Sequence, residues 1–223
     1  MVTDILWIII AAVAGFGISA IFSGWLKLPR NLYLLFYIPL AGVLFAVFVI
    51  VENISIREVL THNWYWGLLA AAVASFIVIR NVLSQPSSER NKGSALVLDI
   101  LWPGLAYGLT DSLLLTVLPI LAVREAFADP LLSDGWTGKI AFGILALLAS
   151  FIVTVAYHLG YQEFRNKKVL WTMLGNGVLS LAYILTMNPL AAILPHIGMH
   201  ITALIHGRET TGQVPPHYHE PKT

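Results

Sequence analysis

Long apolar stretches, separated by short polar segments, recur along the whole chain of 223 residues. A helix needs about 20 largely apolar residues to cross the hydrocarbon core of a bilayer. Seven stretches approach this length, and the clearest polar separators are the linker 84–94 and the turn at Asn188 and Pro189. The pattern predicts an all-α, polytopic helical membrane protein with about seven transmembrane helices. These predicted spans cover approximately residues 4–26, 31–51, 64–83, 95–123, 138–161, 170–187 and 190–206.

The composition excludes several classes of protein. Apolar residues make up 57% of the chain and charged residues 11%, whereas a soluble domain averages about 45–50% and about 25%. With a mean hydropathy of +0.77, an ordinary soluble enzyme, a disordered chain and a nucleic-acid binder are all excluded, and the lipid bilayer is the expected partner. Because the chain has no cysteine, it cannot form disulfides, bind zinc through thiolates or use a cysteine nucleophile.

Basic residues sort between the two sides of the predicted bundle. If seven spans alternate in direction, ten of the 13 Lys and Arg residues fall on one side and three (Arg57, Arg124 and Lys139) on the other. Cytoplasmic loops of membrane proteins carry the excess of Lys and Arg. We therefore expect an integral protein of the plasma (inner) membrane, with its N-terminus outside and its C-terminus in the cytoplasm.

The fourth span differs from the others and suggests a division of the chain. It is long and contains Pro103 and Pro119, and proline removes a backbone donor and clashes with the preceding turn. The sequence therefore predicts a helix that is kinked or broken near one of these prolines, which would let Asp111 face a polar cavity. We expect three units: N-terminal helices and linker over 1–94, a core over 95–206 and a polar, proline-rich tail over 207–223.

Five ionisable residues within the spans are candidates for function, because burying such groups in a membrane is costly. They are Asp99, Asp111, His158, His196 and His200. His196 and His200 stand four residues apart and so share a helix face, a spacing that lets two imidazoles bind one metal ion. A third imidazole and a carboxylate would complete a site for zinc or another first-row divalent ion.

Each candidate also has a purely structural interpretation. His158 lies near the end of its span and could contact headgroups, and His200 could form an interhelical hydrogen bond. Asp99 is expected to be an interfacial cap. His206, His217 and His219 lie at the last membrane edge or in the tail, where we expect solvated side chains.

Three segments in order resemble a known family. They are GLTDSLLLTV at 108–117, TVAYHLGY at 154–161 and LGNGVLSLAYILTMNPLAAILPHIGMH at 174–200. Together they resemble the CPBP family of intramembrane metalloproteases, the CAAX-processing and bacteriocin-processing proteins. That family carries EExxxR in one span, FxxxH in a later span, and HxxxN or HxxxD in a still later one. The resemblance covers residues 95–205 and implies a CPBP-like core.

The resemblance implies roles for individual residues. His158 corresponds to the histidine of FxxxH, His196 to that of the last motif, and His200 stands where Asn or Asp is usual. Asp111 and Ser112 stand in place of the two glutamates. Asp111, His158 and His196 are then the implied catalytic residues, and His158, His196 and His200 the implied ligands of a divalent metal such as zinc. Two further departures from the family motifs are Thr116 in place of the arginine and Thr154 in place of the phenylalanine.

The resemblance implies metal-dependent hydrolysis of a membrane-embedded peptide or a lipidated protein C-terminus. Two alternatives stay open at this point. One is a catalytically inactive CPBP-like scaffold or partner subunit, because Ser112 cannot act as a base comparable to glutamate. The other is a seven-span zinc lipid hydrolase similar to alkaline ceramidases and adiponectin receptors, although the first three predicted spans contain no histidine.

Overall fold

The computed structural model describes residues 2–127 and 135–207, which form helices joined by short connections, with no β-strand among them. Six helices in this part of the chain are long and apolar enough to cross a membrane, which confirms the all-α polytopic prediction. The seventh predicted span is the shorter apolar helix α11 (Leu190–His206) of 17 residues, near the lower limit for a span. The predicted tail, with His217 and His219, lies outside the described residues apart from Gly207.

Three of the predicted spans contain π-helical or 3-10 segments or are followed by them. The N-terminal helix α1 continues into the π-helical segment η1, and the fourth span is built from five consecutive helical segments. The bounds are α1 (Val2–Ile18), η1 (Ser19–Trp25), α2 (Arg30–Val51), α3 (Ile56–Thr61), α4 (Trp64–Leu83), α5 (Gly93–Asp99), η2 (Ile100–Ala106), α6 (Tyr107–Ser112), η3 (Leu113–Val117), α7 (Leu118–Ala126), α9 (Gly135–Gly160), η4 (Gln162–Phe164), α10 (Lys168–Thr186) and α11.

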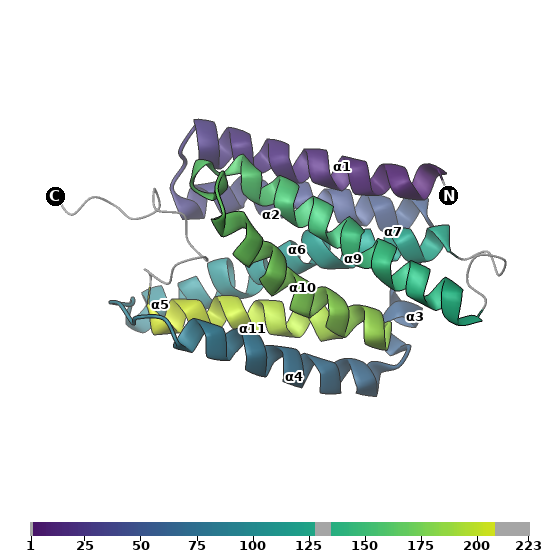
Figure 1. The fold of residues 1–223 in the computed structure, drawn as a ribbon. Coiled ribbons are helices and arrows are strands. Elements are labelled where there is room, and N and C mark those ends of the chain that lie inside the picture. Colours follow the sequence, from purple (N-terminus) through teal and green to yellow (C-terminus); the bar gives the residue numbers. More distant parts are fainter. Residues whose placement is uncertain (1, 128–134, 208–223) are drawn as a thin grey trace.

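The long helices run side by side along one axis, with successive spans antiparallel (Figure 1). The connections α1–α2, α4–α5 and α9–α10 lie at one end, and they hold Lys27, Arg90, Lys92, Arg165 and Lys167. Large exposed tryptophans stand at helix ends: Trp25 closes η1, while Trp136 and Trp171 lie in the first turns of α9 and α10. Tryptophan at both ends of a helical bundle is typical of the two membrane–water interfaces.

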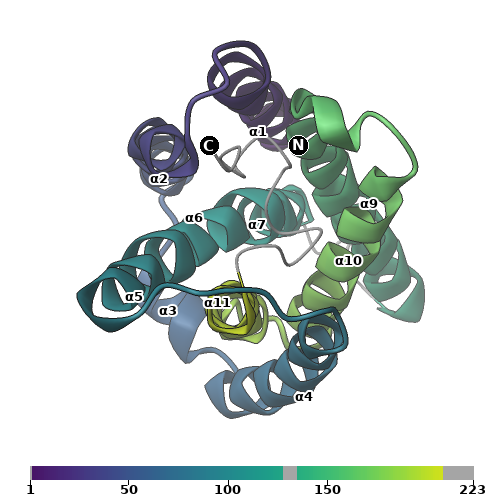
Figure 2. The same ribbon diagram turned by 90° about the vertical axis from the view of Figure 1, so that its left-hand side faces the viewer.

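The fourth span is the central element of the bundle. In the end-on view, α6 and α7 cross between α1 and α2 on one side and α4 and α11 on the other (Figure 2). In its most apolar stretch 83% of the residues are buried, against 22–33% in the five other long helices. Most of its surface therefore contacts protein, whereas the outer helices present apolar faces suited to lipid.

The α-helical pattern of the central span is interrupted near both of its prolines. Pro103 lies inside the π-helical segment η2, and Pro119 follows directly after the π-helical segment η3 and the first residue of α7. A proline lacks the N–H that an α-helical turn requires, and wider π turns accommodate such positions. The α-helical pattern therefore changes near both prolines, but the span does not break, because the chain stays helical through both positions. The predicted kink stays a prediction.

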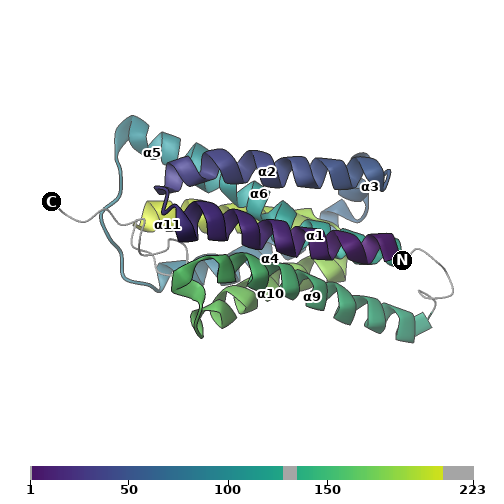
Figure 3. The same ribbon diagram turned by 90° about the horizontal axis from the view of Figure 1, so that it is seen from above.

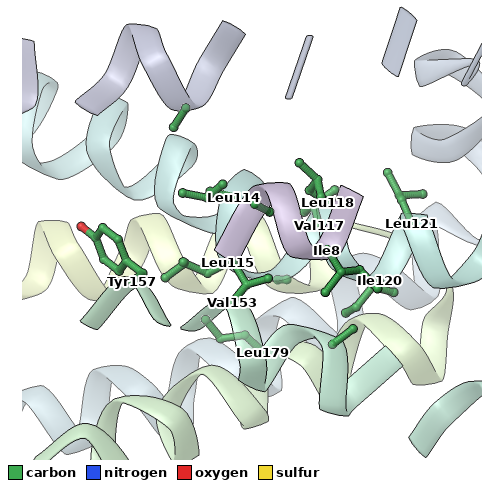
Figure 4. Packing of buried hydrophobic residues seen from close by; sticks show 14 of the residues in the cluster. Ile8, Leu114, Leu115, Val117, Leu118, Ile120, Leu121, Val153, Tyr157 and Leu179 are labelled. Carbon is green, nitrogen blue, oxygen red and sulfur yellow. The ribbon is translucent and has the colours of Figure 1, made fainter. Parts of the chain in front are cut away.

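The hydrophobic core is organised around this central span. Leu114, Leu118 and Leu121 are fully buried, and they pack with Ile8 of α1, Val153 of α9 and Leu179 of α10 (Figure 4). On the outer side α1 and α2 lie next to each other (Figure 3), and the indole N–H of Trp7 donates to Glu52 Oε1 at 2.6 Å.

Candidate metal centre

Two glycines allow the central span to approach α11 closely. A Cβ atom on Gly108 would lie 3.0 Å from Cα of Ile197 and 3.2 Å from Cδ2 of His200, and one on Gly104 would lie 3.0 Å from Cγ1 of Ile201. Small residues spaced four apart let membrane helices pack with their backbones in near contact. Because Asp111 follows Gly108 by three residues, its side chain lies on the same face and points toward α11.

Three of the five candidate residues meet at this helix contact. The metal-ligating atoms of Asp111, His196 and His200 all lie within 4.8 Å of one another, and the three residues are only 3–4% exposed. Nε2 of His196 donates to Oδ2 of Asp111 at 3.2 Å, and Nε2 of His200 lies 3.9 Å from the same oxygen. The two imidazole rings stack in parallel at 5.2 Å, so the shared helix face is confirmed.

The donor atoms of this group fit a metal ion. Nε2 of His200, which faces Oδ2 of Asp111 at 3.9 Å, is buried and forms no hydrogen bond within the described part of the chain. Buried polar atoms are rarely left unpaired, because their desolvation then goes uncompensated. Two imidazole nitrogens and one carboxylate oxygen are a ligand set that binds zinc and other first-row divalent ions. The buried group could therefore hold such an ion.

A tyrosine from α2 completes the surroundings of the carboxylate. The hydroxyl of Tyr37 donates to Oδ1 of Asp111 at 2.6 Å, and Tyr37 is fully buried. The sequence analysis missed this residue, because a tyrosine in an apolar span is usually an interfacial anchor. The available signal was the i, i+4 spacing of Tyr33, Tyr37 and Ala41, all buried on one face of α2. The site thus combines residues from both sides of the predicted boundary at residue 94.

His158 lies outside the group of three ligands. Its Nδ1 donates to the backbone oxygen of Thr154 at 2.8 Å, and its ring packs edge-to-face on Tyr157 and Phe164 near the end of α9. The structure therefore brings together Asp111, His196 and His200, whereas the family resemblance would have His158 as a ligand as well.

The positions that depart from the family motifs have structural partners here. Oγ1 of Thr116 donates to Oδ1 of Asn176 at 2.6 Å, and Nδ2 of Asn176 donates to Oγ1 of Thr154 at 2.7 Å. Nδ2 of Asn176 also donates to Oγ of Ser150 at 2.8 Å. These bonds join the central span to α9 and α10. The hydroxyl of Ser112, in contrast, is buried and forms no hydrogen bond within the described residues.

The remaining polar candidates have contacts at helix ends. Oδ2 of Asp99 accepts a hydrogen bond from Asn91 at 2.7 Å, and Nε2 of His206 donates to the backbone oxygen of Gln85 at 2.7 Å. Both contacts tie the linker between α4 and α5 to neighbouring helices.

No family profile, curated protein or solved structure matches this chain. The functional assignment must therefore come from the geometry of Asp111, His196 and His200.

Proposed function

We propose that this chain is an intramembrane metal-dependent hydrolase in which Asp111, His196 and His200 hold a divalent ion, with zinc as the first choice. One observation carries the proposal: three buried ligand atoms lie within 4.8 Å of one another, and Nε2 of His200 beside Asp111 forms no hydrogen bond among the described residues. A metal ion would offset the negative charge of the buried carboxylate and accept one lone pair from each of the two imidazole rings.

The surrounding residues suit hydrolysis in a water-poor site. A divalent ion bound by such ligands supplies Lewis-acid activation of a water molecule. Tyr107 packs edge-to-face on His200 at 4.7 Å and shields the imidazole from bulk solvent. Because the group lies inside the bundle, the substrate class that fits it best is a membrane-embedded peptide or a lipidated C-terminus, as the likeness to CPBP proteases implies. The excess of Lys and Arg at one end favours a cytoplasmic C-terminus in the plasma (inner) membrane.

A second function, that of a non-catalytic membrane scaffold or partner subunit, is favoured by one specific observation. Among the described residues Asp111 is the only buried acidic side chain. A carboxylate that ligates the metal cannot at the same time serve as the general base, and the hydroxyl of Ser112 is a poor substitute. In this case the metal would hold α6 and α11 together without turning over a substrate.

Metal analysis and a cleavage assay on the full chain separate these possibilities. The purified protein, stripped of metal and reloaded with zinc in detergent, should bind zinc stoichiometrically, and His196→Ala and Asp111→Asn should abolish binding. His206→Ala, at the end of the same helix, is the matched control and should keep the zinc. The loaded protein is then offered a hydrophobic membrane peptide and a lipidated C-terminal peptide. Zinc-dependent cleavage supports the hydrolase, whereas bound zinc without cleavage favours the scaffold. Absence of zinc binding by the unaltered chain refutes the metal centre.

A further inference from the structure

We propose that Tyr37 is a positioning residue of the metal centre, holding one oxygen of Asp111 so that only the other faces the metal. This inference rests on the proposed function, because it concerns the same three ligands. Tyr37 belongs to α2, outside the segments that resemble a known family, and contributes no ligand to the group itself.

The hydroxyl of Tyr37 has a different kind of hydrogen-bond partner from the hydroxyls of the neighbouring tyrosines. Tyr37 lies within a cluster of buried tyrosines, with ring centroids 5.4–5.5 Å from three of them. The other hydroxyls of the cluster hydrogen-bond to one another, in the pairs Tyr33–Tyr157 at 3.1 Å, Tyr107–Tyr157 at 2.9 Å, Tyr157–Tyr161 at 2.7 Å and Tyr161–Tyr33 at 2.9 Å. The hydroxyl of Tyr37, in contrast, donates to Oδ1 of Asp111.

The two oxygens of Asp111 are divided between two kinds of partner. Oδ1 accepts the Tyr37 hydroxyl at 2.6 Å, while Oδ2 faces Nε2 of His196 at 3.2 Å and Nε2 of His200 at 3.9 Å. A carboxylate with one oxygen engaged in a short hydrogen bond binds a metal through the other. Catalytic zinc sites use three protein ligands and keep a fourth position for water or substrate. The Tyr37 hydrogen bond would prevent Oδ1 from occupying that position.

Among the described residues, Tyr37 donates the hydrogen bond that reaches a ligand from outside the group of three. Nδ1 of His196 and Nδ1 of His200 form no hydrogen bonds within the described residues. Metal-binding histidines are usually oriented through that second nitrogen. In this centre the Tyr37–Asp111 bond is therefore the hydrogen bond, among the described residues, that orients a ligand from outside the group. Loss of such an outer partner lowers metal affinity by about 10–100-fold.

Cobalt(II) binding to the full chain in detergent micelles tests the proposal. Tyr37→Phe keeps the ring and removes the hydroxyl, so we expect affinity for cobalt to fall by about 10–100-fold. We also expect the visible absorption of the bound cobalt to weaken, because a second carboxylate oxygen raises the coordination number and higher-coordinate cobalt(II) absorbs less strongly. Tyr33→Phe, one turn earlier on α2, is the matched control and should keep the affinity and the spectrum.

Infrared difference spectra of the unaltered chain give a second, independent measurement, with Asp111→Asn identifying the carboxylate bands. A wide separation between the antisymmetric and symmetric stretches, typical of one-oxygen coordination, is expected on cobalt loading. A narrow, two-oxygen separation overturns the role of Tyr37, as does a Tyr37→Phe variant whose affinity and spectrum match the unaltered chain. An equal loss in Tyr33→Phe also overturns it, since the whole tyrosine cluster would then be responsible. In these three cases the metal centre itself stands, whereas absence of cobalt binding by the unaltered chain refutes both proposals.

Discussion

Replacing Gly108 by alanine leaves the three ligands in place but crowds the backbone of α11 and the ring of His200. Gly108 lies in α6 where the central span meets α11, and an added Cβ would stand 3.0 Å from Cα of Ile197. The atom it meets belongs to the backbone, so no side-chain rotation can relieve the contact. Helix α6 or α11 must move instead, and these two helices carry Asp111, His196 and His200.

The size of this movement can be worked out from the structure. Ordinary van der Waals contact of a Cβ begins at 3.4 Å, so the 3.0 Å contact requires a shift of at least 0.4 Å (3.4 minus 3.0). Metal–ligand distances tolerate deviations of only about 0.2 Å. The cost to folding should be modest, about 1–3 kcal/mol for an overpacked contact. Gly108→Ala should therefore reduce metal affinity severely while most of the protein still folds.

Zinc affinity and stability should be measured on the same preparations. A competition assay with a zinc-binding dye reports affinity, and titration with a denaturing detergent reports the free energy of unfolding. Gly42→Ala and Gly17→Ala are matched controls, because an added Cβ at either helical position has no neighbouring atom within 4 Å. Both controls should bind zinc as the unaltered chain does.

Two experimental outcomes would refute this structural explanation. If Gly108→Ala binds zinc with unchanged affinity, the close approach of α6 and α11 does not set the geometry of the ligands. If Gly42→Ala loses zinc as well, the effect is a general response to added methyl groups in the bundle. Either result would contradict the structural explanation of the site.

Four other predictions can be tested with similar preparations. His158→Gln should retain stoichiometric zinc by elemental analysis, whereas His200→Ala should lose it; the reverse result would favour the ligand set that the family resemblance implies. Acidification should release zinc, because a protonated imidazole cannot ligate, so zinc retention that is independent of pH would exclude histidine ligands. Asn176→Leu should lower the free energy of unfolding by about 1–3 kcal/mol, because it leaves the buried hydroxyl of Thr116 without its acceptor; unchanged detergent unfolding would contradict this. A reporter fused after Thr223 should read as cytoplasmic, and an external signal would reverse the orientation inferred from Lys and Arg.

The sequence determined the spans, because the signal for a membrane helix is local. Each apolar stretch must satisfy its own backbone hydrogen bonds within the bilayer, and only a helix can do so without a partner. The same reasoning made Asp111, His196 and His200 candidates, since a polar side chain within a span is costly wherever it points. The shared face of the two histidines also followed from sequence, because a spacing of four residues is a property of the single helix.

The tertiary structure decided which candidates meet. Helices of a membrane protein are apolar on the lipid side as well as on the inner side, so hydrophobic periodicity does not mark the face that packs on a neighbour. The sequence therefore could not show that Gly104 and Gly108 bring Asp111 against α11. Nor could it show that Tyr37 reaches Asp111 across 74 positions of sequence, or that His158 hydrogen-bonds to its own helix. These contacts depend on the relative placement of whole helices, which is set by the sum of many packing contacts between distant segments.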